Sequence, residues 1–233
     1  MPAKPTILIS GASKGIGKEI AGHYLKQGFR VISISRSASE PHENHTQYLA
    51  DISNETEVMK VIKDLKIKKT NIDVLINNAG IANMNFMIST SMSKATEIMN
   101  TNFLGVFLLT REVSKMMIRK NYGRIINISS VAVPLHLQWE SIYAASKSAL
   151  EEFTRIIAKE LAPFHITANI LGPNPIATDL IKNIPDKNVS EVIEKQSIKR
   201  KGELYDIIHC LDFFMDEKSK FITGQTLYLG GVF

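Results

Sequence analysis

Cysteine is nearly absent from this chain, which has only Cys210 among its 233 residues. An intrachain disulfide is therefore excluded, and a buried thiol in a reducing compartment is expected. The six histidines lack the spacing of metal ligands and have no cysteine partners, so no metal site is predicted. No apolar run approaches the roughly 18 residues that cross a bilayer. The chain is expected to be cytoplasmic and to have no membrane partner.

Long segments of one charge sign are also absent. The formal net charge of +5 comes mainly from scattered lysines, with two modest basic clusters at residues 66–69 and 199–201. A nucleic-acid-binding surface would need a concentrated basic stripe, so no nucleic acid partner is predicted. The sequence contains no repeat, low-complexity segment or obvious linker, and its length fits one domain spanning residues 1–233.

Short apolar runs alternate with longer segments of helical periodicity. The runs predict strands at residues 6–10, 30–35, 48–50, 73–77, 124–129, 166–171 and 226–229. Apolar spacing of about 3.6 residues predicts helices at residues 15–27, 55–65, 94–120, 143–161 and 203–215. Strands apolar enough to be buried on both faces indicate an α/β fold, in which helices cover both faces of a parallel sheet. Residues 172–189 contain three prolines and are too long for a plain connection, so a substrate lid is predicted at about 172–200.

Tyr143 and Lys147 lie four residues apart within a predicted helix. One helical turn places a phenol and an ammonium on the same face, and such a pair can move a proton. Because this spacing is common on solvated helices, its meaning depends on two further motifs. The first consists of Ser129 and Ser130 at the end of an apolar run, with Ser130 thirteen residues before Tyr143.

The second motif is a glycine-rich loop directly after the first predicted strand. Gly11, Gly15 and Gly17 have the spacing Gly-x-x-x-Gly-x-Gly rather than the more general Gly-x-Gly-x-x-Gly. Gly11 and Gly15 allow a tight turn and close approach to a pyrophosphate, and Gly17 allows close helix packing. The helix that begins there offers unpaired amides and the positive end of its dipole. The loop is therefore predicted to bind a phosphorylated cofactor.

In chain order, these motifs resemble those of the short-chain dehydrogenase/reductase family, and the resemblance covers nearly the whole chain. Within that family, the sequence most resembles those of the 3-oxoacyl-acyl-carrier-protein reductases. The resemblance implies a single-domain, doubly wound, Rossmann-like parallel sheet with a nicotinamide cofactor at the carboxyl ends of its strands. The positions that match the family's cofactor-binding and catalytic motifs are Gly11, Ser13, Lys14, Gly15, Ile16, Gly17, Asp51, Ile52, Asn78, Ala79, Gly80, Asn102, Ser130, Tyr143, Lys147, Pro173, Ile176 and Thr178.

The resemblance also implies where four of these residues lie relative to the cofactor. Asp51 is expected near the adenine, and Asn78 is expected to brace the central strands beside the cofactor. Thr178 and the backbone of Ile176 are expected at the nicotinamide carboxamide.

The sequence departs from the family pattern after the strand predicted at residues 166–171. The family usually has Pro-Gly there, whereas in this chain Pro173 is followed by Asn174 and Pro175. Asparagine tolerates a left-handed backbone, but a following proline favours extended geometry. An unusual loop over the nicotinamide is therefore expected.

The family's mechanism is hydride transfer with general acid catalysis. By resemblance, Tyr143 would protonate the developing alkoxide of a ketone, or deprotonate an alcohol in reverse, while Ser130 would hydrogen-bond the same oxygen. Lys147 would lower the pKa of the phenol from about 10 and would also hold the nicotinamide ribose. Asn102 would either keep a water on Lys147 or brace a helix kink. Ser129 competes with Ser130, but the spacing to Tyr143 favours Ser130.

Charge at the end of the second predicted strand indicates which cofactor is used. An enzyme that prefers NAD would have an acid there to bind the ribose hydroxyls. The sequence instead has Ser35, Arg36 and Ser37. Arg36 and Lys14 would flank a 2′-phosphate, and the serines would add hydrogen bonds. The predicted cofactor is NADP(H).

The predicted substrate is a carbonyl compound or its alcohol. An apolar pocket wall suits an acyl or aromatic compound. An acyl carrier protein could present the substrate, but this chain has Asn121 and Phe164 where the carrier-dependent enzymes have docking arginines, and Arg119 and Lys120 are the nearest substitutes. The expected wall residues are Met84, Phe86, Val131, Leu135, His136, Leu137, Trp139, Ile176 and Ile181.

Two alternatives remain open from the sequence. One is a reductase of sugar or polyketide intermediates, and the other is a catalytically idle NADP(H)-binding regulatory protein on the same fold. The intact catalytic set argues against an idle protein. The resemblance also implies a homotetramer or dimer, in which the helices at residues 94–120 and 143–161 pair across a two-fold axis.

Overall fold

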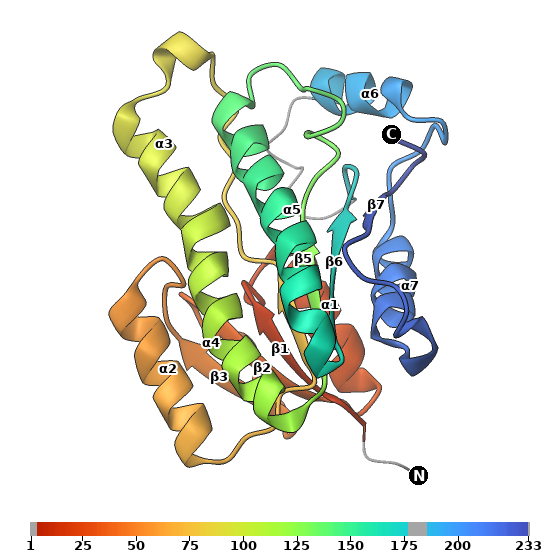
Figure 1. The fold of residues 1–233 in the computed structure, drawn as a ribbon. Helices are drawn as coiled ribbons and strands as arrows, with labels where there is room; N and C mark the ends of the chain where they lie inside the picture. Colours follow the sequence, from red (N-terminus) through yellow and green to blue (C-terminus); the bar gives the residue numbers. More distant parts are fainter. Residues whose placement is uncertain (1–3, 177–185, 233) are drawn as a thin grey trace.

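The computed structural model of the protein describes residues 4–176 and 186–232 and has a sheet at its centre (Figure 1). Within these residues the sheet has seven strands in the order β3-β2-β1-β4-β5-β6-β7, and all neighbours are parallel. The chain runs outward from β1 to β3 and then returns to β4 on the other side of β1, so the strand order reverses between β1 and β4. The predicted doubly wound, Rossmann-like sheet is confirmed. The strands are β1 (Thr6–Ser10), β2 (Arg30–Ser35), β3 (His45–Leu49), β4 (Val74–Asn77), β5 (Gly123–Ile128), β6 (Ile166–Gly172) and β7 (Thr226–Tyr228).

Helices cover both faces of the sheet, because alternate strand residues point to opposite sides. Ile7 and Ile9 of β1 pack into one apolar cluster with helices α1 and α7, whereas Leu8 packs into a second cluster with α2, α4 and α5. Figure 1 shows α2, α4 and α5 in front of the strands. The helices are α1 (Gly15–Lys26), α2 (Glu55–Ile67), α3 (Met92–Met99), α4 (Gly105–Lys120), α5 (Ser141–Leu161), α6 (Asp186–Lys195) and α7 (Leu204–Met215), with short 3-10 segments at Met87–Ser89, Ala162–Phe164 and Glu217–Ser219.

Three elements differ from the sequence-based expectation. The helix predicted at residues 94–120 consists of α3 and α4, which are joined by a π-helical turn at Asn100–Leu104. The irregular stretch predicted at residues 172–189 ends earlier, because α6 already begins at residue 186. This helix is short and mostly polar, but Val189, Val192 and Ile193 have helical spacing, a signal that the sequence argument missed. Strand β3 is half-exposed rather than buried on both faces, because it forms an edge of the sheet.

A chain of buried polar side chains fastens α4 and α5 to the sheet. The amide nitrogen of Asn77 on β4 donates to Asn127 Oδ1 on β5 at 2.8 Å and to Thr110 Oγ1 on α4 at 2.9 Å. The amide nitrogen of Asn127 in turn donates to Thr154 Oγ1 on α5 at 2.7 Å. These bonds hold α5 in a fixed register against β5, and both elements contribute to the site described below.

None of the helices that the structure describes has the length and apolar character needed to cross a membrane. Within the described part of the chain, no three side chains of His, Cys, Asp or Glu are grouped so that they could hold a metal ion.

Candidate active site

Helix α5 places Tyr143 and Lys147 on one face, next to the carboxyl end of β5. The Lys147 ammonium is buried, with 4% of the residue exposed, and it donates a hydrogen bond of 2.8 Å to the carbonyl oxygen of Ile128. Its nitrogen lies 5.9 Å from the centre of the Tyr143 ring. The structure therefore brings together the phenol and the ammonium that the sequence spacing predicts.

Of the two serines after β5, Ser130 interacts with the phenol. Hydrogen bonding from Ser130 favours the ionised form of Tyr143 and thus acts to lower its pKa. The backbone N–H of Ala132 donates to Ser130 Oγ at 3.1 Å, which orients the hydroxyl. Ser129 is buried and donates instead to Glu151 Oε1 at 2.6 Å. This arrangement agrees with the choice of Ser130 that the spacing indicates.

The pKa of Tyr143 is raised, not lowered as the sequence argument expects. Burial of the phenol is the main cause and raises its pKa from 10.0 to about 12; the nearby Glu140 carboxylate adds to this, and the Ser130 hydrogen bond opposes it. Removal of a phenolate from water costs more than the Ser130 hydrogen bond returns. The Tyr143 hydroxyl is therefore protonated at neutral pH.

Lys147 is shifted in the opposite direction. Burial penalises its ammonium and lowers its pKa from 10.5 to about 8, while the negative charge of Glu151 acts to raise it. A lysine with this pKa is mostly protonated at neutral pH and loses its proton under mildly alkaline conditions. Of Tyr143 and Lys147, the lysine is therefore the group whose charge changes closer to neutral pH.

Asn102 lies in the π-helical turn between α3 and α4 and is fully buried. Its Oδ1 accepts from the N–H of Ile81 at 2.8 Å, and its Nδ2 donates to the Ile81 carbonyl at 2.9 Å and to Ser146 Oγ at 3.0 Å. Gly80 separates Asn102 from Lys147, because a Cβ on this glycine would lie 3.3 Å from Asn102 Oδ1 and 3.4 Å from Lys147 Nζ. Asn102 thus braces an irregular helix beside the lysine.

The glycine-rich loop after β1 has the shape of a phosphate cradle. Gly11 and Gly15 have φ values of +72° and +54°, which side chains rarely tolerate. A Cβ on Gly17 would lie 2.3 Å from both Asn78 Nδ2 and the Gly11 carbonyl oxygen. Helix α1 begins at Gly15, and no side chain caps its first amides, because Lys14 at the cap position makes no capping bond. The residues present therefore fit a dinucleotide pyrophosphate.

Asn78 joins the glycine loop to the end of β4. Its Nδ2 donates to the carbonyl oxygens of Ser10 at 3.2 Å and Gly11 at 3.1 Å. The N–H groups of Asn78 and Ala79 donate to Ser10 Oγ at 3.2 and 3.1 Å. These bonds hold β1 and β4 together at the point where the strand order reverses, which is where ligands bind in open α/β sheets.

Two segments that follow neighbouring strands meet beside this loop. Arg36, directly after β2, is exposed and lies 4.0 Å from an oxygen of Asp51, measured from its Nη1. Ser37 Oγ donates to Ser13 Oγ at 3.1 Å, so the segment after β2 touches the glycine loop. Ser35 is buried at the end of β2, and its hydroxyl has no hydrogen-bond partner within the described residues.

The other predicted cofactor residues have different positions. Ile16 is half-buried in the first turn of α1, and Lys14 is exposed just before it. Ile52 is buried, and a Cβ on Gly105 would lie 2.8 Å from its carbonyl oxygen, so this glycine allows the π turn to approach the segment after β3. Thr178 and the wall residue Ile181 lie outside the described residues.

Asn174, which replaces the glycine usual in the family, points into the protein. Its Nδ2 donates to Gln196 Oε1 at 2.8 Å, and the N–H of Gly202 donates to the Pro175 carbonyl at 3.0 Å. Ile176 also forms a bridge with Gly202. The segment that Pro173 opens is thus tied to residues 196–202. Asn174 does not have a positive φ, in keeping with the extended backbone that a following proline favours.

The predicted wall residues belong to segments at the open end of the site. The rings of Phe86 and Trp139 lie 5.1 Å apart between centres, and the Asn85 N–H donates to the Trp139 carbonyl at 2.8 Å. Trp139 and His136 are exposed and have positive φ values of +71° and +48°, which are unusual for such residues. The loop that ends at α5 is therefore strained next to Tyr143.

Helix α6, which the sequence pattern does not predict, approaches the same wall. Leu135 packs with Val131 and with Val192 of α6. Asn188 Nδ2 lies 4.0 Å from the sulfur of Met84. Sequence reasoning also misses Glu151, although its position one helical turn after Lys147 was a signal that could have been used.

Comparison with known proteins identifies the family. The sequence profile of the short chain dehydrogenase family matches residues 5–189, and the chain belongs to this family of oxidoreductases, which use nicotinamide cofactors. A 3-oxoacyl-[acyl-carrier-protein] reductase of Buchnera aphidicola subsp. Schizaphis graminum is 34% identical, over 98% of this chain and 96% of that protein. The corresponding Escherichia coli K12 protein is 29% identical, over 96% of this chain and 95% of its own length.

Solved structures agree on the fold and differ in the cofactor. Thermoplasma acidophilum aldohexose dehydrogenase has a TM-score of 0.90 at 28% identity, covering 99% of this chain and 94% of its own. ElxO with NADP bound has a TM-score of 0.87 at 28% identity, covering 97% of each chain. A 4-hydroxyisoleucine dehydrogenase complexed with NADH has a TM-score of 0.86 at 28% identity, covering 98% of each chain. The neighbours therefore include both NADP and NADH proteins.

Proposed function

We propose that this protein is an NADP(H)-dependent reductase that converts a ketone, of the 3-oxoacyl or a related carbonyl class, to an alcohol. The observation that carries the proposal is the arrangement of half-buried Tyr143 with buried Lys147 and Asn102 beside Ser130, at the carboxyl end of β5. Burial of the Lys147 ammonium is unfavourable, and a catalytically idle protein would have no functional reason to keep a charged side chain there.

The cofactor, when bound, supplies the hydride. Tyr143 then gives its proton to the oxygen that becomes the alcohol, and Ser130 donates a hydrogen bond to the same oxygen. A phenol with a pKa of about 12 stays protonated at neutral pH, so it suits the role of proton donor in ketone reduction. Lys147 holds the nicotinamide ribose, and Asn102 keeps the water through which the proton is replaced.

The charges beside the glycine loop support NADP(H) as the cofactor. Arg36 and Lys14 are exposed cations at the end of β2 and at the start of α1, where a 2′-phosphate would lie. The bond between Ser37 and Ser13 places two hydroxyls in the same region. Asp51 lies near Arg36, and we assign it to the adenine side of the cofactor.

An apolar entrance supports an acyl or aromatic substrate. Phe86 and Trp139 form a tilted aromatic pair with about half of each residue exposed, and Met84, Leu135 and His136 complete the proposed wall. The relatives that are 3-oxoacyl-[acyl-carrier-protein] reductases favour an acyl substrate that an acyl carrier protein presents.

We also propose a homo-oligomer, either a dimer or a tetramer, in the cytoplasm. The exposed face of the π turn, α4 and α5 carries Leu104, Phe107 and Ile156, which are exposed by 50%, 38% and 49%. Pairing of these helices with those of a second copy would cover this apolar face.

A substrate panel tests the function. NADPH oxidation should be followed with 3-oxoacyl thioesters, free sugars and small aromatic ketones, with Tyr143→Phe as the inactive control. Turnover of acyl thioesters well above the other classes is expected. Preference for sugars would replace the substrate assignment, and no turnover of any ketone, with NADPH still bound, would leave the idle protein as the better description.

A further inference from the structure

Glu151 is a buried carboxylate that the proposed chemistry does not use. It lies on α5, one turn after Lys147 and two turns after Tyr143, and only 3% of the residue is exposed. A buried charge without partners would be strongly destabilising, so its surroundings show what it interacts with.

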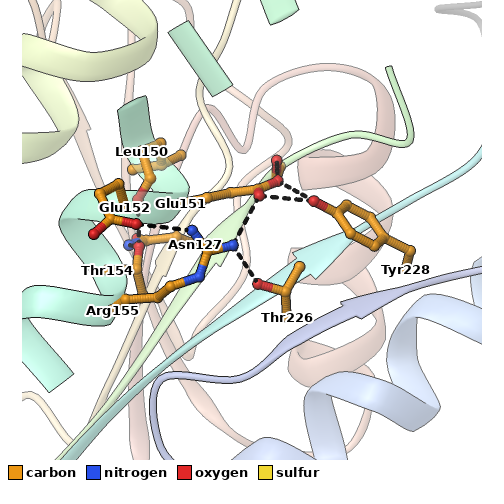
Figure 2. A network of polar contacts seen from close by, with 9 residues as sticks. Asn127, Leu150, Glu151, Glu152, Thr154, Arg155, Thr226 and Tyr228 are labelled. Carbon is orange, nitrogen blue, oxygen red and sulfur yellow. Dashed lines mark hydrogen bonds and ion pairs between the residues drawn. The ribbon is translucent and has the colours of Figure 1, made fainter. Parts of the chain in front are cut away.

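Three donors from different parts of the chain converge on this carboxylate. Figure 2 shows the hydroxyl of Tyr228 on β7 directed at Glu151, and Arg155 approaching from the next turn of α5. Tyr228 Oη lies 2.7 Å from each carboxylate oxygen, Ser129 Oγ donates to Oε1 at 2.6 Å, and Arg155 Nη2 donates to Oε2 at 3.3 Å. Both oxygens of the buried carboxylate therefore have hydrogen-bond partners.

The same carboxylate is connected to the catalytic groups through adjacent backbone positions. Lys147 binds the carbonyl of Ile128, and Glu151 binds the hydroxyl of Ser129, which is the next residue. Ser130 follows immediately. Lys147 and Glu151, one turn apart on α5, therefore bind two consecutive residues of the segment that leads to Ser130.

We propose that Glu151 is a positioning residue of this site, which supplies the buried countercharge of Lys147 and fixes, through Ser129, the segment that carries Ser130. This inference deepens the proposed function and rests on it for the role of Lys147. Among the described residues, the charged or titratable groups that contact the carboxylate are Arg155 from α5 and Tyr228 from β7, and Lys147 lies one turn before it on the same helix.

The direction of the electrostatic effect follows from the charges. Burial lowers the pKa of Lys147 to about 8, and the Glu151 charge opposes this shift. Removal of the carboxylate charge should therefore lower the pKa of Lys147 further and leave more of the lysine neutral at pH 7. Loss of the contact with Ser129 should instead slow the reaction without moving its pH dependence.

The test measures Lys147 directly, in protein without cofactor or substrate. Lysine labelled with ¹³C at Cε is titrated by NMR, and the Lys147 signal is assigned by its loss in Lys147→Arg. In Glu151→Gln, the pKa of Lys147 should fall by about one unit. In Glu151→Asp, the carboxylate remains but lies one methylene closer to the backbone, so the pKa of Lys147 should fall by less. The control is Glu152→Gln, which removes an exposed charge paired with the same Arg155 and should leave Lys147 unchanged.

Activity provides the second measurement. In Glu151→Gln, the fall of kcat/KM for ketone reduction at alkaline pH should begin at a lower pH than in the parent. In Ser129→Ala, kcat should be about tenfold lower, and the pH at which kcat/KM falls should be unchanged. If Glu151→Gln does not fold, Glu151→Asp and Ser129→Ala still test both effects. An unchanged Lys147 titration in the folded Glu151 variants overturns the inference even if the parent reduces ketones. A shifted titration in a protein that reduces no ketone overturns the proposed function alone.

Discussion

The Nζ of Lys147 lies 2.8 Å from the carbonyl oxygen of Ile128, the last residue of β5. This hydrogen bond joins the helix that carries Tyr143 to the strand end that precedes Ser130. It also holds the ammonium in a place where only 4% of the residue is exposed. The contact therefore fixes the geometry of the site, whereas burial of the ammonium, and not this hydrogen bond, lowers the pKa of the lysine.

The pH dependence of reduction should report on Lys147. Its pKa is lowered to about 8, and in the proposed mechanism the charged form is the active one, so activity should be present below this pH and lost as the pH rises through it. We expect kcat/KM for NADPH to fall about tenfold per pH unit above about pH 8.5. In Lys147→Arg, the side chain stays charged, so any remaining activity should not fall above about pH 8.5. A parent profile that is level up to about pH 10 would contradict this role.

Tyr143→Phe should remove reduction and leave cofactor binding nearly intact. The substitution deletes the transferable proton but keeps the ring, so we expect a loss in kcat of at least about 100-fold and a change in NADPH affinity of less than about twofold. Single-turnover assays and a fluorescence titration with NADPH measure the two quantities. Turnover within tenfold of the parent would show that another group donates the proton. The matched control is Tyr205→Phe, because Tyr205 is exposed on α7.

Much of this architecture could be predicted because its signals are local. The inner strands are continuous apolar runs because they are buried on both faces. Gly11 and Gly17 are visible in the sequence because a backbone with positive φ and a close packing contact both require glycine. Tyr143 and Lys147 share a face by helical periodicity alone.

What could not be predicted depends on contacts between distant residues. Helix α6 follows a segment with three prolines, which favours a loop, and its packing on Val131 and Leu135 is tertiary. The raised pKa of Tyr143 results from burial, which no sequence motif encodes. The partners of Glu151 include Tyr228, which lies 77 positions away in the chain.

Gln196→Ala should destabilise the segment of residues 196–202, at the C-terminal end of the predicted lid. Gln196 is 1% exposed, accepts from Asn174, and donates to the carbonyls of Ile198 and Arg200 at 3.1 Å each. Its loss leaves buried polar groups without partners, so we expect a fall of about 2 kcal/mol or more in the free energy of unfolding. Urea denaturation measures this fall, and faster tryptic cleavage at the basic cluster of residues 199–201 would locate it. The exposed Gln225→Ala is the control and should change stability by less than about 0.5 kcal/mol.

The double variant Lys14→Ala, Arg36→Ala tests the choice of cofactor. Both side chains are exposed, and the Arg36 side chain is 70% exposed, so solvent screens its contact with a phosphate. We therefore expect each lost cation to weaken NADPH binding by about tenfold, at the low end of charge-assisted bonds. NADH has no 2′-phosphate, and its affinity should stay within about twofold.

Both cofactors should be titrated at fixed ionic strength, and again at higher salt, where the difference between NADPH and NADH should narrow. Lys18→Ala is the matched control, because this lysine is also exposed on α1 but lies near Glu40 and not in the glycine loop. An equal loss for the two cofactors would show that Lys14 and Arg36 act through structure. A parent protein that prefers NADH would reverse the assignment, and Asp51, 4.0 Å from Arg36, would then be the acid to test as the ribose ligand.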